Sequence, residues 1–129
     1  MKDHRLPAAE FTVMKAMWAA GAPVTSAEIM RSIGEERGWK PQTLLTLLSR
    51  LTERGFITAR PGKGREKLFS TLISREEYLA CETSVFMDEV HGRSIGSLLA
   101  ALNREKMSAS DLQELQTWFD QLKREASEP

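Results

Sequence analysis

The sequence predicts a mainly α-helical protein with one small β-hairpin, in which three helices precede the hairpin and three helical segments follow it. Apolar side chains recur at i, i+3, i+4 and i+7 in several segments, which is the period of an amphipathic helix. In one stretch this period gives way to strand-like residues on either side of a Pro-Gly cluster. The 129-residue chain is 41% hydrophobic and 28% charged, which is typical of a globular protein.

The most informative segment is the predicted helix over residues 41–54. Four leucines at helical spacing form its apolar face: Leu44, Leu47, Leu48 and Leu51. The opposite face carries short polar side chains and an arginine, which are the groups that bind base edges and phosphates in DNA: Gln42, Thr43, Thr46, Ser49, Arg50 and Glu53. Pro41 suits the first helical turn, and Gly55 suits the residue that follows the last turn. An ordinary amphipathic helix with a solvated face is the alternative interpretation.

Two helices are predicted before this segment and a hairpin after it. The first helix covers residues 8–20, and a capping box at residues 25–28 begins a second that runs to about Ile33. Strand-like residues 56–60 and 65–70 flank a turn at 61–64. The hairpin carries three basic side chains at and after its turn: Lys63, Arg65 and Lys67.

Helix, helix, helix and basic hairpin is the order of a winged helix-turn-helix domain. In that fold the third helix enters the major groove of DNA, and the hairpin, or wing, lies along the flanking backbone. A solvated turn whose charges resist edge-to-edge pairing is the alternative for the hairpin.

The remainder of the chain predicts a helical region with an unpartnered apolar stripe. A second capping box at 74–77 begins a helix to about Val90, residues 95–102 are apolar and helical, and Ser108 caps a last helix to about Glu125. The last helix has five large apolar side chains on one stripe: Leu112, Leu115, Trp118, Phe119 and Leu122. We therefore predict a winged-helix DNA-binding domain over 1–73 and a helical dimerisation region over 74–129. Folding of the stripe back onto the first domain is the alternative.

The charge distribution supports this division. The net charge is zero, but residues 1–73 hold 12 lysines and arginines against 7 acidic residues, whereas residues 74–129 hold 6 against 11. The first part is therefore suited to a polyanion. We expect a cytoplasmic protein without membrane insertion, because no apolar run approaches the length of a membrane span and no signal peptide opens the chain.

The sequence offers little for catalysis or metal binding. Two histidines, His4 and His91, and a single cysteine, Cys81, are too few and too far apart for a metal site, and no nucleophile–base motif is present. We therefore expect no cofactor, no metal and no enzyme activity. Cys81 is interpreted as a packing residue, with redox sensing as the alternative.

Several blocks together resemble the penicillinase-repressor (BlaI/MecI-type) family of bacterial transcriptional regulators. They cover residues 9–18, 25–29, 39–51, 54–55, 64–65 and 107–115. The resemblance implies a homodimeric repressor that binds a dyad-symmetric, double-stranded DNA operator. It assigns base reading to Gln42, Thr43, Thr46 and Arg50, and we assign the DNA backbone to Lys40, Lys63, Arg65 and Lys67.

Two departures from family patterns concern how repression is relieved. In the β-lactam-responsive members a membrane sensor protease cuts an Asn-Phe bond, and the matching step in this sequence is Ala100-Ala101. A regulatory protease is therefore a partner implied by the resemblance, at a bond of different chemistry. The copper-responsive members end in a cysteine cluster, which residues 124–129 lack. A winged-helix module that binds protein, and a sensor of a ligand or metal, remain the rival functions.

Overall fold

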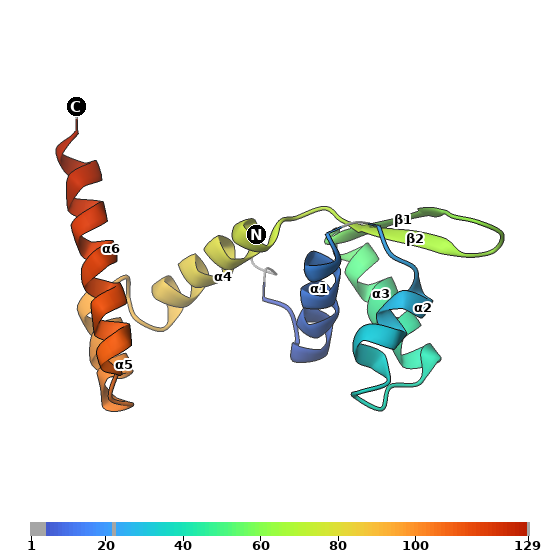
Figure 1. Cartoon of the computed structure of the whole chain (residues 1–129), viewed down its shortest axis with the longest axis horizontal. Coiled ribbons are helices and arrows are strands. Elements are labelled where there is room, and N and C mark those ends of the chain that lie inside the picture. The colour runs from blue at the N-terminus through green and yellow to red at the C-terminus, as the bar shows by residue number, and fades with distance from the viewer. Residues whose placement is uncertain (1–4, 22, 129) are drawn as a thin grey trace. The chain divides into compact units, whose positions relative to one another are not determined.

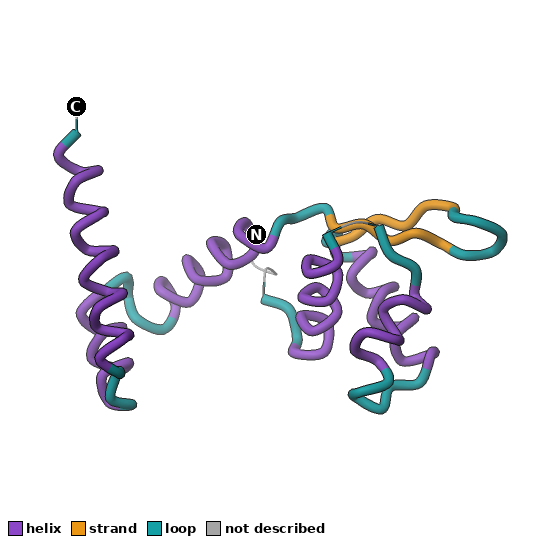
Figure 2. Tube along the Cα trace, viewed as in Figure 1, coloured by secondary structure: helices purple, strands orange, loops and turns teal. Residues whose placement is uncertain are grey.

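Three helices and a hairpin follow one another in the first part of the chain (Figures 1 and 2). The computed structural model describes residues 5–21 and 23–128. Its first elements are α1 (Ala8–Ala20), α2 (Ser26–Ile29), the π-helical turn η1 (Met30–Gly34), α3 (Pro41–Glu53), β1 (Ile57–Pro61) and β2 (Lys67–Thr71). The two strands are antiparallel, and an isolated bridge joins Val24 to Phe69. This order is that of a winged helix-turn-helix, as the sequence predicts.

The capping box that begins α2 is formed as predicted. The amide of Glu28 donates to the Thr25 hydroxyl oxygen at 3.2 Å, and the amide of Thr25 donates to the Glu28 carboxylate at 2.9 Å. These bonds to Thr25 hold the pKa of Glu28 below its ordinary value. The reciprocal bonds satisfy amide groups that a helix start leaves open.

The second helix ends in a widened turn that hydrophobic spacing did not predict. The amide of Glu35 bonds the Met30 carbonyl at 2.9 Å, and the amide of Trp39 bonds the Gly34 carbonyl at 2.8 Å. Gly34 is buried, and a Cβ atom at this position would lie 2.5 Å from the Met30 sulfur. A side chain at residue 34 would therefore require the Met30 side chain to move away from this π-helical turn.

Helix α3 ends at the glycine that the sequence indicated. Gly55 has a φ of 83° and its amide bonds the Thr52 carbonyl, while the amide of Phe56 bonds the Leu51 carbonyl at 3.0 Å. This pair of bonds is a Schellman motif, which satisfies the last carbonyls of a helix. Because the Phe56 amide is used here, strand β1 begins one residue later than predicted.

All residues of the hydrophobic core in the described chain fall within the sequence range from Leu6 to Tyr78. All four leucines of the apolar face of α3 are buried in it, as predicted. The other members come from every neighbouring element: Leu6, Val13, Met14, Met17, Val24, Ile29, Phe56, Ile57, Phe69 and Tyr78. This core fixes α3 with its polar side outward.

Helix α4 (Arg75–Glu89) is joined to this core by its first turns. The amide of Leu6 donates to the buried Tyr78 hydroxyl at 3.0 Å, and the Trp18 indole N–H donates to the Ile73 carbonyl at 2.9 Å. Phe11 stacks on Tyr78 at a ring-centroid distance of 5.4 Å. Burial raises the pKa of Tyr78, since the phenolate would be poorly solvated.

The chain divides into a first compact unit that ends at Ser84 and a second that begins at Val85. We call the first unit the head and the second the tail. The boundary after Ile73, between a DNA-binding domain and a dimerisation region, stays a prediction, because it concerns function and not compactness.

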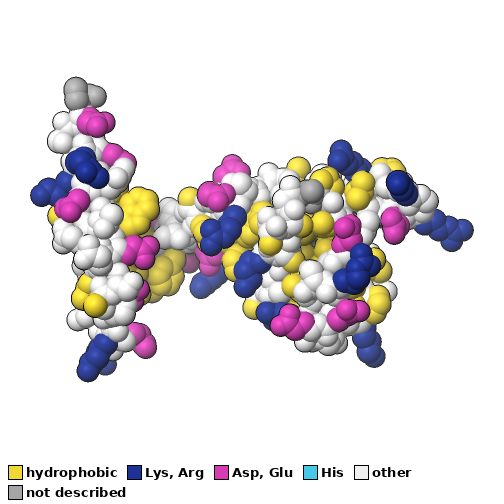
Figure 3. Space-filling model, in the orientation of Figure 1, with side chains coloured by type: hydrophobic (Ala, Val, Ile, Leu, Met, Phe, Trp, Pro, Cys, Tyr) yellow, Lys and Arg dark blue, Asp and Glu magenta, His cyan; other side chains and the backbone are white. Residues whose placement is uncertain are grey.

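The tail contains the end of α4 and two further helices, α5 (Ile95–Arg104) and α6 (Ala109–Ser127). Ser94 and Ser108 cap α5 and α6, and Asp111 completes a capping box at the latter. None of the residues in α5 or α6 is buried. Hydrophobic side chains are accordingly visible on the surface of these helices (Figure 3).

Candidate nucleic-acid interface

The polar face of α3 is exposed along its whole length. The predicted base-reading residues Gln42, Thr43, Thr46 and Arg50 are all exposed. Lys40 is exposed in extended backbone as the residue that precedes the helix. A shallow hollow of about 390 Å³ runs along this face, lined by Gln42, Leu45, Thr46, Ser49, Arg50 and Glu53. Helix α3 therefore presents one row of side chains that can contact base edges in the major groove of DNA.

The two threonines of this face differ in what their hydroxyl groups do. The Thr46 hydroxyl donates to the Gln42 carbonyl at 3.0 Å, one helical turn earlier. The Thr43 hydroxyl has no hydrogen bond to any described residue. Thr43 is therefore free to donate to a base or phosphate, whereas Thr46 has its proton committed to the helix.

The hairpin has two faces that the pairing register defines. Ile57 lies opposite Thr71, Ala59 opposite Phe69 and Pro61 opposite Lys67, and this face includes the buried Ile57 and Phe69. Arg60, opposite Leu68, points to the other face, because side chains alternate along a strand. Lys67 therefore shares the side of the hairpin that packs against the core.

Beyond the strands, the tip of the wing is basic. Lys63 and Arg65 lie in the turn, where Gly64 has a φ of 63° and the Gly62 amide bonds the Glu66 carbonyl at 2.8 Å. Both side chains are exposed, and lysine and arginine side chains project from the hairpin in Figure 3.

A groove of about 690 Å³ joins three parts of the head. Its lining includes Thr25 and Ser26 before and in α2, Leu45 and Ser49 of α3, and wing residues Arg65 and Lys67. The structure thus brings Arg65 and Lys67 to the same groove as one edge of α3. Neither Lys40 nor Lys63 is among its described lining residues.

Sequence reasoning missed an ion pair that links α1 to the end of α3. Glu10 is buried at 1% exposure, and its Oε1 atom lies 3.4 Å from the Nε atom of Arg54 without a hydrogen bond. The pair positions the C-terminal end of α3 against α1. The spacing of Glu10 with Val13, Met14 and Met17 was the available signal, because it places a carboxylate on a buried stripe.

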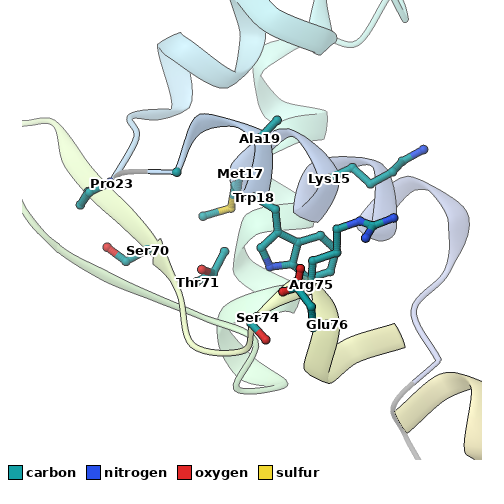
Figure 4. Close-up of a pocket in the computed structure, with 11 residues that line it drawn as sticks. Lys15, Met17, Trp18, Ala19, Pro23, Ser70, Thr71, Ser74, Arg75 and Glu76 are labelled. Carbon is teal, nitrogen blue, oxygen red and sulfur yellow. The ribbon is translucent and has the colours of Figure 1, made fainter. Parts of the chain in front are cut away.

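A further hollow of about 650 Å³ lies between the end of α1, β2 and the start of α4 (Figure 4). Met17 and Trp18 form its apolar part, and the Trp18 indole N–H is already bonded to the Ile73 carbonyl. None of its described lining residues comes from α3, so this hollow is separate from the polar face of α3.

Metal binding and redox sensing were considered above only as alternatives, at His4, His91 and Cys81. No group of three or more metal-ligating side chains gathers within residues 5–21 and 23–128. Cys81 is half-buried, and a nitrogen of the His91 ring lies 2.8 Å from the Ser97 hydroxyl, while His4 lies outside the described residues. No helix within the described part of the chain is long and apolar enough to cross a membrane.

A buried three-helix core that exposes the polar face of its third helix beside a basic wing defines a winged helix-turn-helix DNA-binding protein. The sequence model described as Penicillinase repressor matches residues 6–121. The chain therefore belongs to the penicillinase repressor family of DNA-binding transcriptional repressors, whose members are not enzymes.

Individual relatives agree with this assignment. The penicillinase repressor of Bacillus licheniformis is 24% identical over 115 residues, which are 88% of this chain and 88% of that protein. The methicillin resistance regulatory protein MecI of Mammaliicoccus sciuri is 27% identical over 117 residues, which are 88% of this chain and 92% of that protein. The solution structure of the DNA-binding domain of the repressor BlaI covers 57% of this chain and 88% of its own, with 26% identity and a TM-score of 0.50.

Proposed function

We propose that this repressor is a homodimer that recognises a dyad-symmetric DNA operator in a sequence-specific manner. The observation that carries the proposal is the exposed row of polar side chains on α3, flanked by basic residues of the wing. Two heads related by a two-fold axis would place their α3 helices in successive major grooves, about one helical turn of DNA or a multiple of it apart.

The residue roles follow from position and chemistry. Arg50 is suited to bind a guanine through two hydrogen bonds, and Gln42 and Thr43 offer an amide and a free hydroxyl to other bases. The basic residues Lys40, Lys63, Arg65 and Lys67 neutralise phosphates and position the head on the duplex. Among these four, Lys67 has the strongest structural support, because its strand register directs it to the groove beside α3.

Dimerisation is assigned to the apolar stripe of α6. Its five residues are Leu112, Leu115, Trp118, Phe119 and Leu122, each between 40% and 58% exposed in the single chain. A row of large exposed apolar side chains of this length is unusual on a monomer and suits an interface between two copies.

Fluorescence anisotropy with DNA tests the proposal. The full chain would be titrated with a dyad-symmetric duplex, obtained by selection from a random library, and with a scrambled duplex over a range of salt concentrations. We expect the selected duplex to bind about a thousandfold or more tightly, with both half-sites required. Equal binding to both duplexes would contradict sequence-specific recognition, and the rival function as a protein-binding module would then be favoured.

The substitution Arg50→Ala tests base reading. We expect it to cost about 1–3 kcal/mol of binding free energy on the selected operator and to relax the preference at one base pair, as a lost bidentate contact does. The measurement is anisotropy on operators that vary at each position. A loss of equal size on operator and scrambled DNA would assign Arg50 to the backbone instead.

The matched substitutions Lys67→Ala and Arg60→Ala test the placement of the wing. Both remove one positive charge from an exposed strand position, but the two side chains lie on opposite faces of the hairpin. We expect Lys67→Ala to weaken binding to all sequences alike and to flatten the salt dependence by about one unit, whereas Arg60→Ala changes both much less. The two variants behaving alike would contradict an approach of the wing by its core-facing side.

Release of the operator by a regulatory protease in the cytoplasm is a further part of the proposal. The matching bond, Ala100-Ala101, lies inside α5, and both residues are exposed. A protease needs extended backbone, so cleavage at this bond would require local unfolding of α5. Limited proteolysis of the full chain with the fragments identified by mass tests whether this helix opens at that bond.

A further inference from the structure

The exposed face of α3 contains one large apolar side chain among its polar ones. Leu45 is 46% exposed, although the neighbouring Leu44 is fully buried in the core. Leu45 lines both the hollow along α3 and the groove towards the wing. Leu45 is not among the buried core residues, and its position in both hollows leaves apolar surface open on the face that is proposed to meet DNA.

A second apolar group opens into the same hollow. Because the Thr46 hydroxyl donates to the Gln42 carbonyl, its oxygen atom is turned back against the helix backbone. The methyl group is the branch of this exposed side chain that makes no bond to the helix backbone. Thr46 therefore presents an apolar surface to the solvent rather than a free hydroxyl donor.

The remaining walls of the hollow are polar. Gln42 and Ser49 offer an amide and a hydroxyl, and Arg50 and Glu53 offer opposite charges. In the major groove, thymine is the one ordinary base that presents a methyl group, and the methyl lies next to the O4 acceptor. A hollow with apolar groups beside hydrogen-bond donors matches that edge.

We propose that Leu45 and the methyl group of Thr46 read the 5-methyl group of thymine in each operator half-site. This inference rests on the proposed function, because it names the base chemistry that the same face of α3 recognises. It assigns Thr46 to apolar contact rather than to hydrogen bonding, and it adds Leu45 to the residues that determine specificity.

Replacement of single thymines by deoxyuridine tests the proposal, since this change removes only the methyl group. Anisotropy titrations of the full chain on the selected operator would be repeated with each thymine replaced in turn. We expect about a fourfold loss of affinity at one or two thymines of each half-site, the loss that accompanies one buried methyl group. Unchanged affinity at every thymine would overturn the proposal.

Three variants separate the methyl from the hydroxyl of Thr46 and test Leu45. Thr46→Val keeps the methyl group and should retain both the affinity and the sensitivity to deoxyuridine. Thr46→Ser and Leu45→Ala each remove apolar surface, and they should bind thymine and deoxyuridine operators equally well. A loss of affinity in Thr46→Val, with the affinity kept in Thr46→Ser, would show that the hydroxyl group is the reader, because serine retains it.

The same titrations distinguish failure of methyl reading from failure of sequence-specific recognition. Preference for the selected operator over scrambled DNA, without any deoxyuridine effect, would overturn methyl reading and leave the proposed repressor function intact. Absence of any preference in the unmodified chain would instead overturn sequence-specific recognition itself. Thermal unfolding followed by circular dichroism checks that the variants fold, which we expect because both side chains are exposed.

Discussion

The head buries its large apolar side chains within the single chain, whereas the tail leaves them exposed. In the head, the leucines of α3, the methionines of α1 and Tyr78 of α4 cover one another in a single core. In the tail, α6 has an apolar stripe of similar composition, yet Trp118 and Phe119 remain 58% and 56% exposed. The same helical periodicity thus yields a self-sufficient core in one region and an open surface in the other. This open stripe is the surface to which the proposed dimerisation is assigned.

We expect the greatest loss of stability on replacing a buried leucine of α3, in contrast to its exposed neighbour. Leu44→Ala leaves a cavity in the core of the head and should lower the free energy of unfolding by about 2–5 kcal/mol. The adjacent Leu45→Ala is its control and should change the unfolding free energy by no more than about 0.5 kcal/mol. Urea unfolding followed by circular dichroism measures both. Equal effects would mean that the head does not have the core described above.

A smaller effect is expected in the tail, and it concerns association. Trp118→Ala should weaken the dimer by about 2–4 kcal/mol, because large aromatic residues commonly dominate such interfaces. Gln113→Ala, on the opposite side of α6, is the matched control and should leave the dissociation constant unchanged. Sedimentation equilibrium over a range of concentrations measures both variants. A dimer that survives Trp118→Ala would place the interface elsewhere.

The smallest effect that we expect is a pH dependence of the stability of the head. Hydrogen bonds from Thr25 and Ser74 hold the pKa values of Glu28 and Glu77 below the ordinary value of 4.5. A lowered pKa in the folded state means that the unfolded chain binds more protons near that pH. The stability contributed by each carboxylate is therefore present above pH 4.5 and is lost as the pH falls through the folded pKa.

Glutamine variants isolate this contribution. Glu28→Gln and Glu77→Gln should melt at lower temperature than the unmodified chain at pH 7, and the difference should narrow below about pH 4.5. Glu76→Gln, whose carboxylate makes no capping bond, is the control and should show a smaller change. A difference that is constant with pH would contradict a role for the charged carboxylates.

Much of the head could be predicted from local pattern. The bounds of the first helix, the two capping boxes, the four buried leucines of α3 and the terminal role of Gly55 all follow from periodicity and backbone chemistry within a few residues. These features are local, because each depends on neighbours one or two helical turns away. The identity of the family also followed from short blocks of sequence, and the match to residues 6–121 confirms it.

The candidate interface was predicted only in part. The sequence identified which face of α3 is polar, but it did not show that the Thr46 hydroxyl is committed to the Gln42 carbonyl. It grouped Lys67 with the turn residues Lys63 and Arg65, whereas the pairing register assigns Lys67 to the core-facing side of the hairpin. Hydrogen bonding and register depend on coordinates, and residue type alone leaves them open.

Local sequence patterns predict the order of helices and strands, the polar and apolar faces of each helix and the family, because periodicity and turn chemistry act over a few residues. The folded structure, in contrast, fixes which distant groups meet. It paired Glu10 with Arg54, set the Leu6 amide on the Tyr78 hydroxyl, and placed the beginning of α4 in the core of the head. Such contacts join residues up to 72 positions apart, and they form because the packed core leaves each buried polar group few partners within reach.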